Sequence, residues 1–325
     1  MALQSSGAIS LNDIQTEFGG TNPISMSEYY RGGAYVTDNN TGVPTSGAIN
    51  INGFYGGTKQ FSYTFSSSAQ EVDLNSTLTT AGWNGSDPVV VTINSSVYLW
   101  SDNTSTGGLT ISSAFNGLLT ITNNGYIIGR GGNAGQAGGP ALVNNATGVI
   151  LTNASGAFIA GGGGGGGGRG GGGAGGGNGV GGYRESPPTS YTAGVGGAIG
   201  QNGTNGQSGA YSGGSYNGAG LGGGAGGGGA GAEPRTDGYA GYGASGGGGR
   251  VLTVSTSYGQ GAFGGLGDGG TGGSNGNAGS NGTYGGGGGG WGAAGGNSGG
   301  AGGAAISGTA IATYTNNGTV YGSTA

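Results

Sequence analysis

The residue types that most often carry out catalysis are scarce in this chain. Its 325 residues include no histidine and no cysteine, which removes the commonest general bases, nucleophiles and zinc ligands. A pair of carboxylates of the kind that glycosidases use is still possible in principle. The acidic residues are scattered, however, and no spacing singles out two of them. We therefore expect a protein that is not an enzyme and that has no metal site and no cofactor.

Tyrosine and arginine offer a different chemistry, that of recognition. They gather in five segments between glycine tracts, at 183–193, 207–217, 232–242, 250–258 and 274–284. Loops rich in Tyr, Ser, Gly and Asn are typical of antibody combining sites, because tyrosine supplies rigid amphipathic contact area at low entropic cost. The candidate contact residues for a partner are Tyr183, Arg184, Tyr191, Tyr211, Tyr216, Arg235, Tyr239, Tyr242, Tyr258 and Tyr284. The alternative is that these tyrosines only shield the ends of the tracts.

The elements that must position these loops are the glycine tracts themselves. The longest lies between residues 161 and 182, and further tracts occupy 218–231, 243–249, 259–273 and 285–303. Glycine loses the most conformational entropy on ordering, and a hydrogen bond returns only about 0.5–1.5 kcal/mol, so one isolated tract is not stable. Several tracts side by side can pair laterally, since the polyproline II conformation leaves every N–H and C=O group free. We expect a bundle of polyglycine II helices.

Two other structures could explain so much glycine. Collagen is excluded, because the chain keeps no G-X-Y register and has only seven prolines. A flexible Gly/Ser linker stays open on composition alone. The alternation of the tracts with segments that contain Tyr, Trp, Phe and Leu favours the bundle.

Residues 1–59 contain an approximate repeat, in which the sequence of 6–13 returns at 46–53. Two pairs stand at the spacing of a helix capping box: Ser10 with Asp13, and Ser25 with Glu28. We expect short helices here, with Gly19 and Gly32 as their C-terminal stops. So small a module buries little apolar area and needs a partner surface, which indicates an attachment module.

Residues 60–128 have the pattern of a small all-β domain. Apolar and β-branched residues alternate with polar ones, and turn signals separate the segments. The expected strands are 61–65, 89–93, 97–100, 109–111, 118–122 and 126–128.

A second repeat connects this region to the C-terminus. The sequence of 122–129 resembles that of 315–322, and 152–160 is a looser copy. Residues 138–142 are similarly echoed at 302–306. Asn-Gly turns that lead into short strands suggest entry to and exit from the glycine bundle at one end. We expect the C-terminus to return to this base.

The charge and hydropathy of the chain argue against two partner classes. The formal net charge is −5, and Lys59 is the only lysine, so a general affinity for nucleic acid is not expected. Arg130 and Arg169 precede glycines as in RNA-binding RGG segments, but two isolated copies in an acidic chain are weak support. No apolar run approaches the ~20 residues of a membrane span, so we expect no membrane insertion.

These features together resemble those of one family, the glycine-rich distal adhesins of T-even-type bacteriophage long tail fibres. The succession of 123–135, 138–142 and 161–168 is similar to the entry into the glycine-rich domain of that group. Residues 6–11 and 27–33 resemble N-terminal segments of phage tail proteins. In those adhesins the tracts form a sandwich of polyglycine II helices, and variable loops contact a receptor on the bacterial outer membrane.

The resemblance implies a phage tail adhesin of the virion, at the tail tip or tail fibre, and its release at host lysis. The ten candidate contact residues would bind a bacterial surface receptor, either an outer-membrane protein or a glycan, and a tail or baseplate protein would hold residues 1–59. The expected fold is mostly β and irregular: an attachment module at 1–59, a small all-β domain at 60–128 and a polyglycine II bundle with variable loops at 129–325. A homo-oligomer, and a purely structural glycine-rich tail or coat component, stay open as alternatives.

Overall fold

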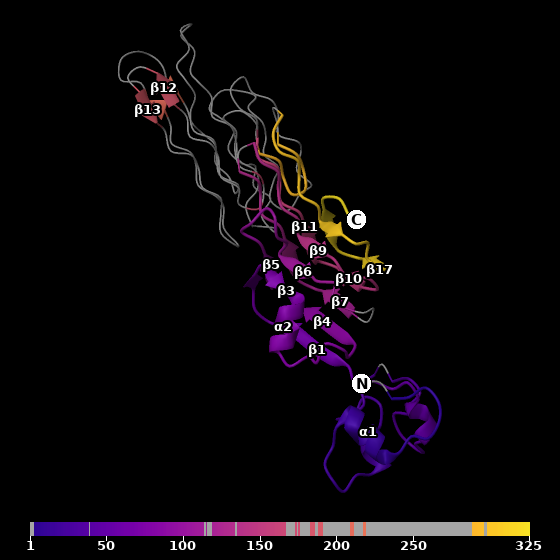
Figure 1. The fold of residues 1–325 in the computed structure, drawn as a ribbon. Helices are drawn as coiled ribbons and strands as arrows, with labels where there is room; N and C mark the ends of the chain where they lie inside the picture. Colours follow the sequence, from indigo (N-terminus) through magenta and orange to yellow (C-terminus); the bar gives the residue numbers. More distant parts are fainter. Residues whose placement is uncertain are drawn as a thin grey trace.

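The structure, a computed structural model, is elongated and mostly β. It describes residues 3–38, 40–113, 115, 119–133, 135–166, 173, 175, 183–185, 188–190, 209–210, 217–218, 288–295 and 298–325. Strands outnumber helices among them, which confirms the mostly-β expectation. Helix α1 lies near one end of the molecule and strands β12 and β13 lie near the other (Figure 1). Within the described ranges, no helix is long and apolar enough to span a bilayer.

Most strands belong to three sheets. The first contains β1 (Phe61–Phe65), β4 (Val89–Ile93), β7 (Leu119–Asn123), β10 (Ile150–Asn153) and β17 (Thr313–Asn316). The second contains β2 (Ala69–Gln70), β5 (Tyr98–Trp100), β8 (Tyr126–Ile128), β11 (Phe158–Ala160) and β18 (Thr319–Tyr321). The third contains β3 (Val72–Asp73), β6 (Leu109–Ile111), β9 (Leu142–Asn144) and β16 (Ile306–Gly308). The six strands expected between residues 61 and 128 are all confirmed, within one residue at each end.

The topology is that of a three-sided parallel β-helix. All pairings within the three sheets are parallel, and consecutive strands of the chain enter successive sheets. Strands β1–β3 form coil one, β4–β6 coil two and β7–β9 coil three. Coil four consists of β10, β11 and β16, and coil five of β17 and β18. This winding was not predicted from the sequence.

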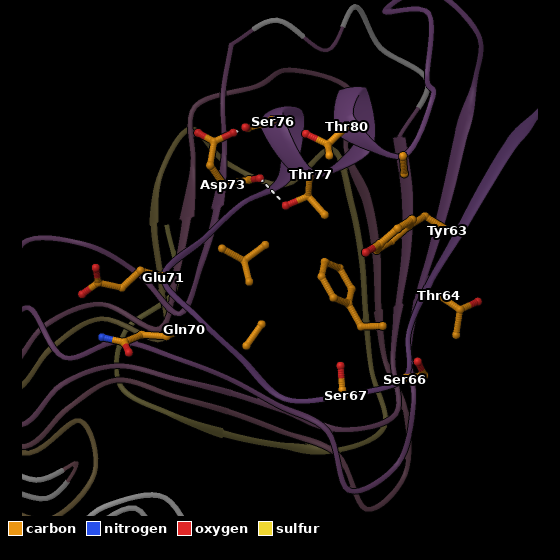
Figure 2. Close-up of a pocket in the computed structure, with 14 residues that line it drawn as sticks. Tyr63, Thr64, Ser66, Ser67, Gln70, Glu71, Asp73, Ser76, Thr77 and Thr80 are labelled. Carbon is orange, nitrogen blue, oxygen red and sulfur yellow. Dashed lines mark hydrogen bonds between the residues drawn. The ribbon is translucent and has the colours of Figure 1, made fainter.

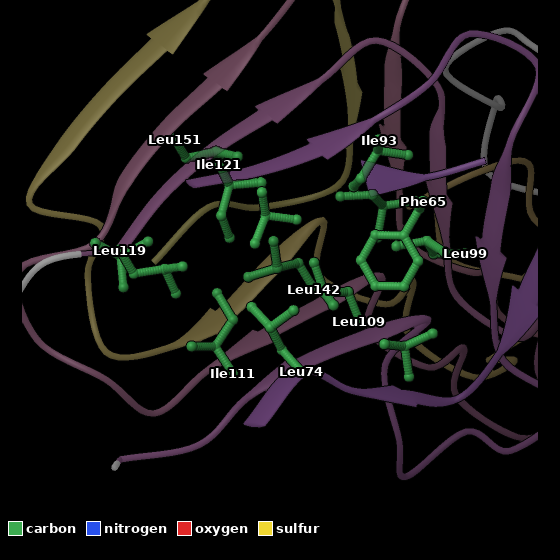
Figure 3. Packing of buried hydrophobic residues seen from close by; sticks show 14 of the residues in the cluster. Phe65, Leu74, Ile93, Leu99, Leu109, Ile111, Leu119, Ile121, Leu142 and Leu151 are labelled. Carbon is green, nitrogen blue, oxygen red and sulfur yellow. The ribbon is translucent and has the colours of Figure 1, made fainter. Parts of the chain in front are cut away.

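Columns of apolar side chains fill the interior of the β-helix (Figure 3). Along the first sheet, Val91, Ile121 and Leu151 are in register and completely buried. The half-buried Tyr63 and Tyr314 occupy the same register position at the two ends of this column. Because successive strand residues point to opposite faces, every second residue of a strand points inward and contributes one member to such a column. Each buried aliphatic side chain contributes about 1.5–3 kcal/mol.

The Asn-Gly repeat forms a ladder at the corner between the first and second sheets. The Asn123 amide donates to Oδ1 of Asn153 over 2.8 Å, and the Asn153 amide donates to Oδ1 of Asn316 over 2.9 Å. Asn123 and Asn153 are completely buried. Gly125 and Gly318 follow in the turns, where an added Cβ would meet backbone carbonyls. The repeated turns are therefore corners of stacked coils.

Residues 3–58 form a module with its own apolar core around Phe18, Tyr29 and Phe54. The predicted capping box is confirmed: Ser10 accepts from the backbone of Asp13, whose carboxylate accepts from the backbone of Ser10. The helices of the module are α1 (Leu11–Phe18), η1 (Met26–Glu28) and η2 (Ile51–Phe54), where η denotes a 3₁₀ helix. Helix α1 ends at Gly19 with φ 90°. Ser25 starts only the single turn of η1.

The remaining helix, α2 (Leu74–Thr80), connects coil one to coil two. Asp73 accepts from the backbone N–H of Ser76 and so caps its first turn. Leu74 and Leu78 are completely buried and extend the core of the β-helix.

The glycine-rich region is inserted at one corner of the β-helix, between the second and third sheets. In coil four the chain leaves this corner after β11 and returns only at β16. Strands β16–β18 pair with β9, β10 and β11, which confirms that the C-terminus returns to the base. Strands from beyond residue 128 thus share the sheets of residues 60–128. The expected boundary at residue 128 does not coincide with a break in the β-helix.

Candidate functional site

The base of the glycine-rich region is held by backbone hydrogen bonds between segments. The first tract, 161–166, continues directly from β11. Its backbone groups form hydrogen bonds to three sets of neighbours in turn. Gly161 and Gly164 bond to 289–293, and Gly162 and Gly165 bond to 136–139 and 300–303. Gly163 and Gly166 bond to 132–135. The N···O distances of these bonds are 2.7–2.9 Å. The neighbours of this tract therefore repeat every third residue.

The segments approach so closely that only glycine fits at many positions. A Cβ added at Gly162 would lie less than 3.0 Å from the carbonyl oxygen of Arg130. The same holds for Gly164 against the carbonyl of Gly300, and for Gly300 against that of Gln136. The obstacle is backbone in each case, so no side chain can move aside to relieve it.

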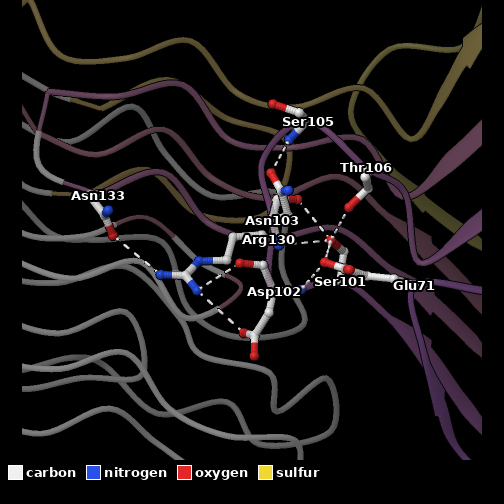
Figure 4. A network of polar contacts seen from close by, with 8 residues as sticks. All are labelled: Glu71, Ser101, Asp102, Asn103, Ser105, Thr106, Arg130 and Asn133. Carbon is white, nitrogen blue, oxygen red and sulfur yellow. Dashed lines mark hydrogen bonds and ion pairs between the residues drawn. The ribbon is translucent and has the colours of Figure 1, made fainter.

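Polar side chains join this base to three coils of the β-helix (Figure 4). Arg130, which follows β8, donates from Nη1 to the backbone oxygen of Asp102 (3.0 Å) and to its Oδ1 (3.3 Å). Its Nη2 donates to Oδ1 of Asn133 over 3.3 Å. On the other side, the Ser101 hydroxyl and the Asp102 N–H both donate to Oε1 of Glu71. Arg130 thus pairs with a carboxylate of the neighbouring coil.

An aromatic cluster secures the returning tract. The indole of Trp291 is only 1% exposed and packs with Ile128, Ala160 and Tyr321. Its ring also passes 3.0 Å from the position of a Cβ added at Gly175. The returning tract is therefore fastened to the second sheet by a large apolar contact.

A row of rings crosses the strands of the second sheet next to this cluster. Centroid separations are 4.5 Å for Tyr98–Tyr126, 5.5 Å for Tyr126–Phe158 and 6.0 Å for Phe158–Tyr321. Burial raises the pKa of Tyr98 and Tyr321 above the usual range, so these phenols add no charge at neutral pH.

A hollow of about 650 Å³ lies in coil one, beside β1, β2, β3 and α2 (Figure 2). Tyr63 and hydroxyl side chains such as Thr80 line it. Its two acids are engaged elsewhere: Asp73 caps α2, and Glu71 accepts from Ser101 and points away from the middle of the hollow. Among the described residues, no group of three or more acidic side chains could hold a metal ion.

The structure describes the backbone at two of the ten predicted contact residues. Tyr183 and Arg184 lie on β12 (Tyr183–Glu185), which pairs antiparallel with β13 (Pro188–Ser190). A second short pair joins β14 (Gly209–Ala210) and β15 (Asn217–Gly218). The other eight lie outside the described residues: Tyr191, Tyr211, Tyr216, Arg235, Tyr239, Tyr242, Tyr258 and Tyr284.

The corner that carries the glycine-rich region and the clamp between Arg130 and Asp102 were not predicted from the sequence. The echo of 138–142 at 302–306 was the available signal, since Leu142 and Ile306 are register partners in the third sheet.

A comparison with protein-family models agrees with the family resemblance. The model of the family described as phage tail fibre adhesin Gp38 matches residues 60–226, just over half of the chain. A crystal structure of the gp37–gp38 adhesin tip complex of the bacteriophage S16 long tail fiber is 20% identical, with a TM-score of 0.44 and 100% of both chains covered. Curated protein sequences gave no significant match. On the family match, this chain belongs to the phage tail fibre adhesins of the Gp38 family, and its place is the tail fibre of a virion.

Proposed function

We propose that the chain recognises a bacterial surface receptor through tyrosine-rich loops displayed on a polyglycine II bundle, and that it does so without catalysis. The observation that carries this proposal is the hydrogen bonding of residues 161–166, whose neighbours repeat every third residue. A threefold helix without internal hydrogen bonds presents its backbone groups in this way. The lateral bonds and the close approach support a stiff platform for the loops.

A stiff platform matters because ordering the binding loops on contact costs free energy. Loops held by a rigid scaffold lose less entropy when a partner binds. In the proposal, the ten candidate residues from Tyr183 to Tyr284 make the contacts. The hairpin of β12 and β13, at the end of the molecule away from α1, is in a suitable place for a receptor (Figure 1).

We also propose that residues 1–59 attach the chain to another tail protein. Their three helices begin alike, with Ser10, Ser25 and Asn50 each accepting a backbone N–H. The next residue is apolar and half-buried in each case: Leu11, Met26 and Ile51. Met26 and Ile51 pack partly against the core of the module, and the apolar surface that stays accessible at these repeated positions supports docking onto a partner. The organisation is then a mount at 1–59, a β scaffold from residue 60 and a receptor-binding region within 129–325.

The test is whether purified protein binds host cells and blocks phage adsorption. Exchange of residues 183–193 for a Gly/Ser/Asn sequence of equal length should reduce both effects. A double substitution at the exposed coil-one corner, Ser66→Ala with Ser67→Ala, is the control and should leave them unchanged. Protease-treated and periodate-treated cells distinguish a protein receptor from a glycan. Unchanged adsorption after exchange of each tyrosine-rich segment would instead identify a structural component without receptor specificity.

A further inference from the structure

The turn between α2 and β4 holds an asparagine side chain against the backbone that follows it. Oδ1 of Asn84 accepts the backbone N–H of Ser86 over 2.9 Å and that of Asp87 over 3.0 Å. Trp83 anchors this turn, because its indole is only 6% exposed, stacks on Phe115 and donates from Nε1 to the carbonyl of Asp87. The Asn84 amide is therefore fixed in a conformation in which two N–H groups polarise its carbonyl.

The next residue, Gly85, has an accessible backbone nitrogen. Asn84 and Gly85 are both exposed, and a Cβ added at Gly85 would meet no heavy atom within 4 Å. Across the parts of the chain that the structure describes, the N–H of Gly85 donates to no acceptor. Water and hydroxide can therefore reach this nitrogen, which directly follows the Asn84 side chain.

These two features bring together the groups for an acyl transfer within the chain. The Gly85 nitrogen gives its proton to hydroxide and attacks Cγ of Asn84. A bond forms between this nitrogen and Cγ, the bond from Cγ to Nδ2 breaks, and Nδ2 takes a proton from water and leaves as ammonia. Backbone N–H groups that point at an oxygen accelerate acyl transfer when that oxygen becomes negative in the intermediate. The N–H groups of Ser86 and Asp87 point at Oδ1 in this way.

We propose that Asn84 and Gly85 form a self-modification site, at which Asn84 cyclises to a succinimide with groups of this chain and water alone. Water then opens the ring at either carbonyl by breaking one carbon–nitrogen bond, and leaves aspartate or isoaspartate at position 84. The product carries one more negative charge than the original chain. Isoaspartate also adds a methylene group to the backbone of a turn that Trp83 anchors.

The Asn-Gly pairs at the corners of the β-helix have a different arrangement. The N–H of Gly125 donates to Oδ1 of the buried Asn123 over 3.1 Å. The N–H of Gly318 donates to Oδ1 of Asn316 over 3.2 Å. A nitrogen whose proton is engaged in this way is a weaker nucleophile, because its deprotonation must first break the hydrogen bond. The ladder asparagines thereby protect the Asn-Gly pairs 124–125 and 317–318 from the same reaction.

The first test compares the folded with the unfolded chain. Full-length protein is incubated at mildly alkaline pH with and without urea, and mass spectrometry of chymotryptic peptides follows deamidation at 84–85, 124–125 and 317–318. A synthetic peptide of residues 81–88 corrects for the effect of urea itself. We expect 84–85 to react several-fold faster in the folded protein, and the other two pairs to react several-fold slower. A folded protein in which 84–85 reacts no faster than in urea overturns the proposal.

Two variants at Ser86 test the part played by the N–H donors. Ser86→Pro removes one donor to Oδ1 of Asn84 and should slow the reaction at 84–85 several-fold. Ser86→Ala keeps the N–H and should leave the rate unchanged. Circular dichroism and Tm establish that both variants fold, and equal rates in two folded variants would refute activation of Oδ1. If Ser86→Pro does not fold, the comparison with the urea-unfolded chain decides the proposal.

A third variant tests the protection at the corners. Asn316→Ala removes the acceptor of the Gly318 N–H, so we expect deamidation at 317–318 to become several-fold faster while the rate at 84–85 stays the same. An unchanged rate at 317–318 would refute protection by the ladder. A rise at both sites would show general loosening of the fold and would also count against it.

Discussion

The β-helix and the glycine-rich base solve the same packing problem in opposite ways. In the β-helix the coils enclose side chains, and Val91, Ile121 and Leu151 fill the space between sheets. In the glycine-rich base, backbone lies directly against backbone, and a single Cβ at Gly164 would collide with the carbonyl of Gly300. Apolar side chains exclude water from the interior of the first region. The segments of the second region can pack only because they have no side chains between them.

This difference determines which substitutions each region tolerates. Removing methyl groups should damage the β-helix, because a cavity remains. Adding a methyl group should damage the glycine-rich base, because packed backbone cannot move aside locally. The hydrophobic effect holds the first region, while the second, apart from the buried contact of Trp291, depends on hydrogen bonds that each contribute only about 0.5–1.5 kcal/mol net. The second region therefore depends on many bonds that form together.

The largest loss of stability should come from a cavity in the core of the β-helix. Leu151→Ala removes a completely buried side chain from the middle of a column, and such changes cost about 2–5 kcal/mol. Urea unfolding followed by circular dichroism measures the loss. The matched control is Ile150→Ala on the same strand, because the Ile150 side chain is 41% exposed. Equal losses for the two variants would contradict the proposed interior column.

The reverse substitution tests the glycine-rich base. Gly164 does not have a positive φ, so alanine suits its backbone, and only the neighbouring carbonyls oppose the added methyl group. We expect Gly164→Ala to cost about 1–3 kcal/mol, as overpacking usually does. Amide exchange should accelerate between 161 and 166 more than in β4 and β7.

Ala301→Ser is the control for this prediction. Ala301 is exposed although it belongs to the returning tract, so the added oxygen meets no packed backbone. The proposed close-packed base would be wrong if Gly164→Ala were as harmless as Ala301→Ser.

The contrast also explains which features could be predicted from the sequence. Strand positions such as 89–93 and the capping pair of Ser10 and Asp13 are local patterns, and the structure confirms both. The winding into coils was missed because it depends on which strands stack. One sign of this winding is present in the sequence, because Asn123 and Asn153, which belong to two copies of the repeat, are thirty residues apart. The long insertion between β11 and β16 hides this period in coil four.

The conformation of the glycine tracts was easier to predict than their neighbours in the fold. Lateral backbone pairing follows from the lack of side chains, and the bonds of 161–166 agree with it. A sequence of glycines carries no register, however, so nothing in it could assign the neighbours of Gly162. The ten contact residues stay a prediction, and Tyr183 and Arg184 are the two with a described backbone.

The asparagine ladder is one place where buried side-chain hydrogen bonds also stabilise the β-helix. Asn153→Ala removes one of the two acceptors of the buried Asn123 amide and the donor to both Asn316 and the Thr319 carbonyl. Loss of hydrogen-bond partners in a buried corner costs about 1–3 kcal/mol, so we expect a loss in that range by thermal or urea unfolding. Asn317→Ala is the control, because the Asn317 side chain is exposed. An indistinguishable pair of variants would mean that the ladder adds nothing to stability.

The clamp between the two regions should have the smallest effect. Arg130 is 17% exposed and Asp102 is 45% exposed, and ion pairs with this access to water contribute about 0–1 kcal/mol. Arg130→Gln should therefore lower Tm only slightly. The ionic part of that difference should shrink when added salt shortens the Debye length to about 3 Å at 1 M. Arg31→Gln, in the N-terminal module, is a control for the loss of one positive charge. If Arg130→Gln instead lowered stability as much as Leu151→Ala, the bond from Arg130 to the Asp102 backbone would hold the regions together, and the contrast between them would weaken.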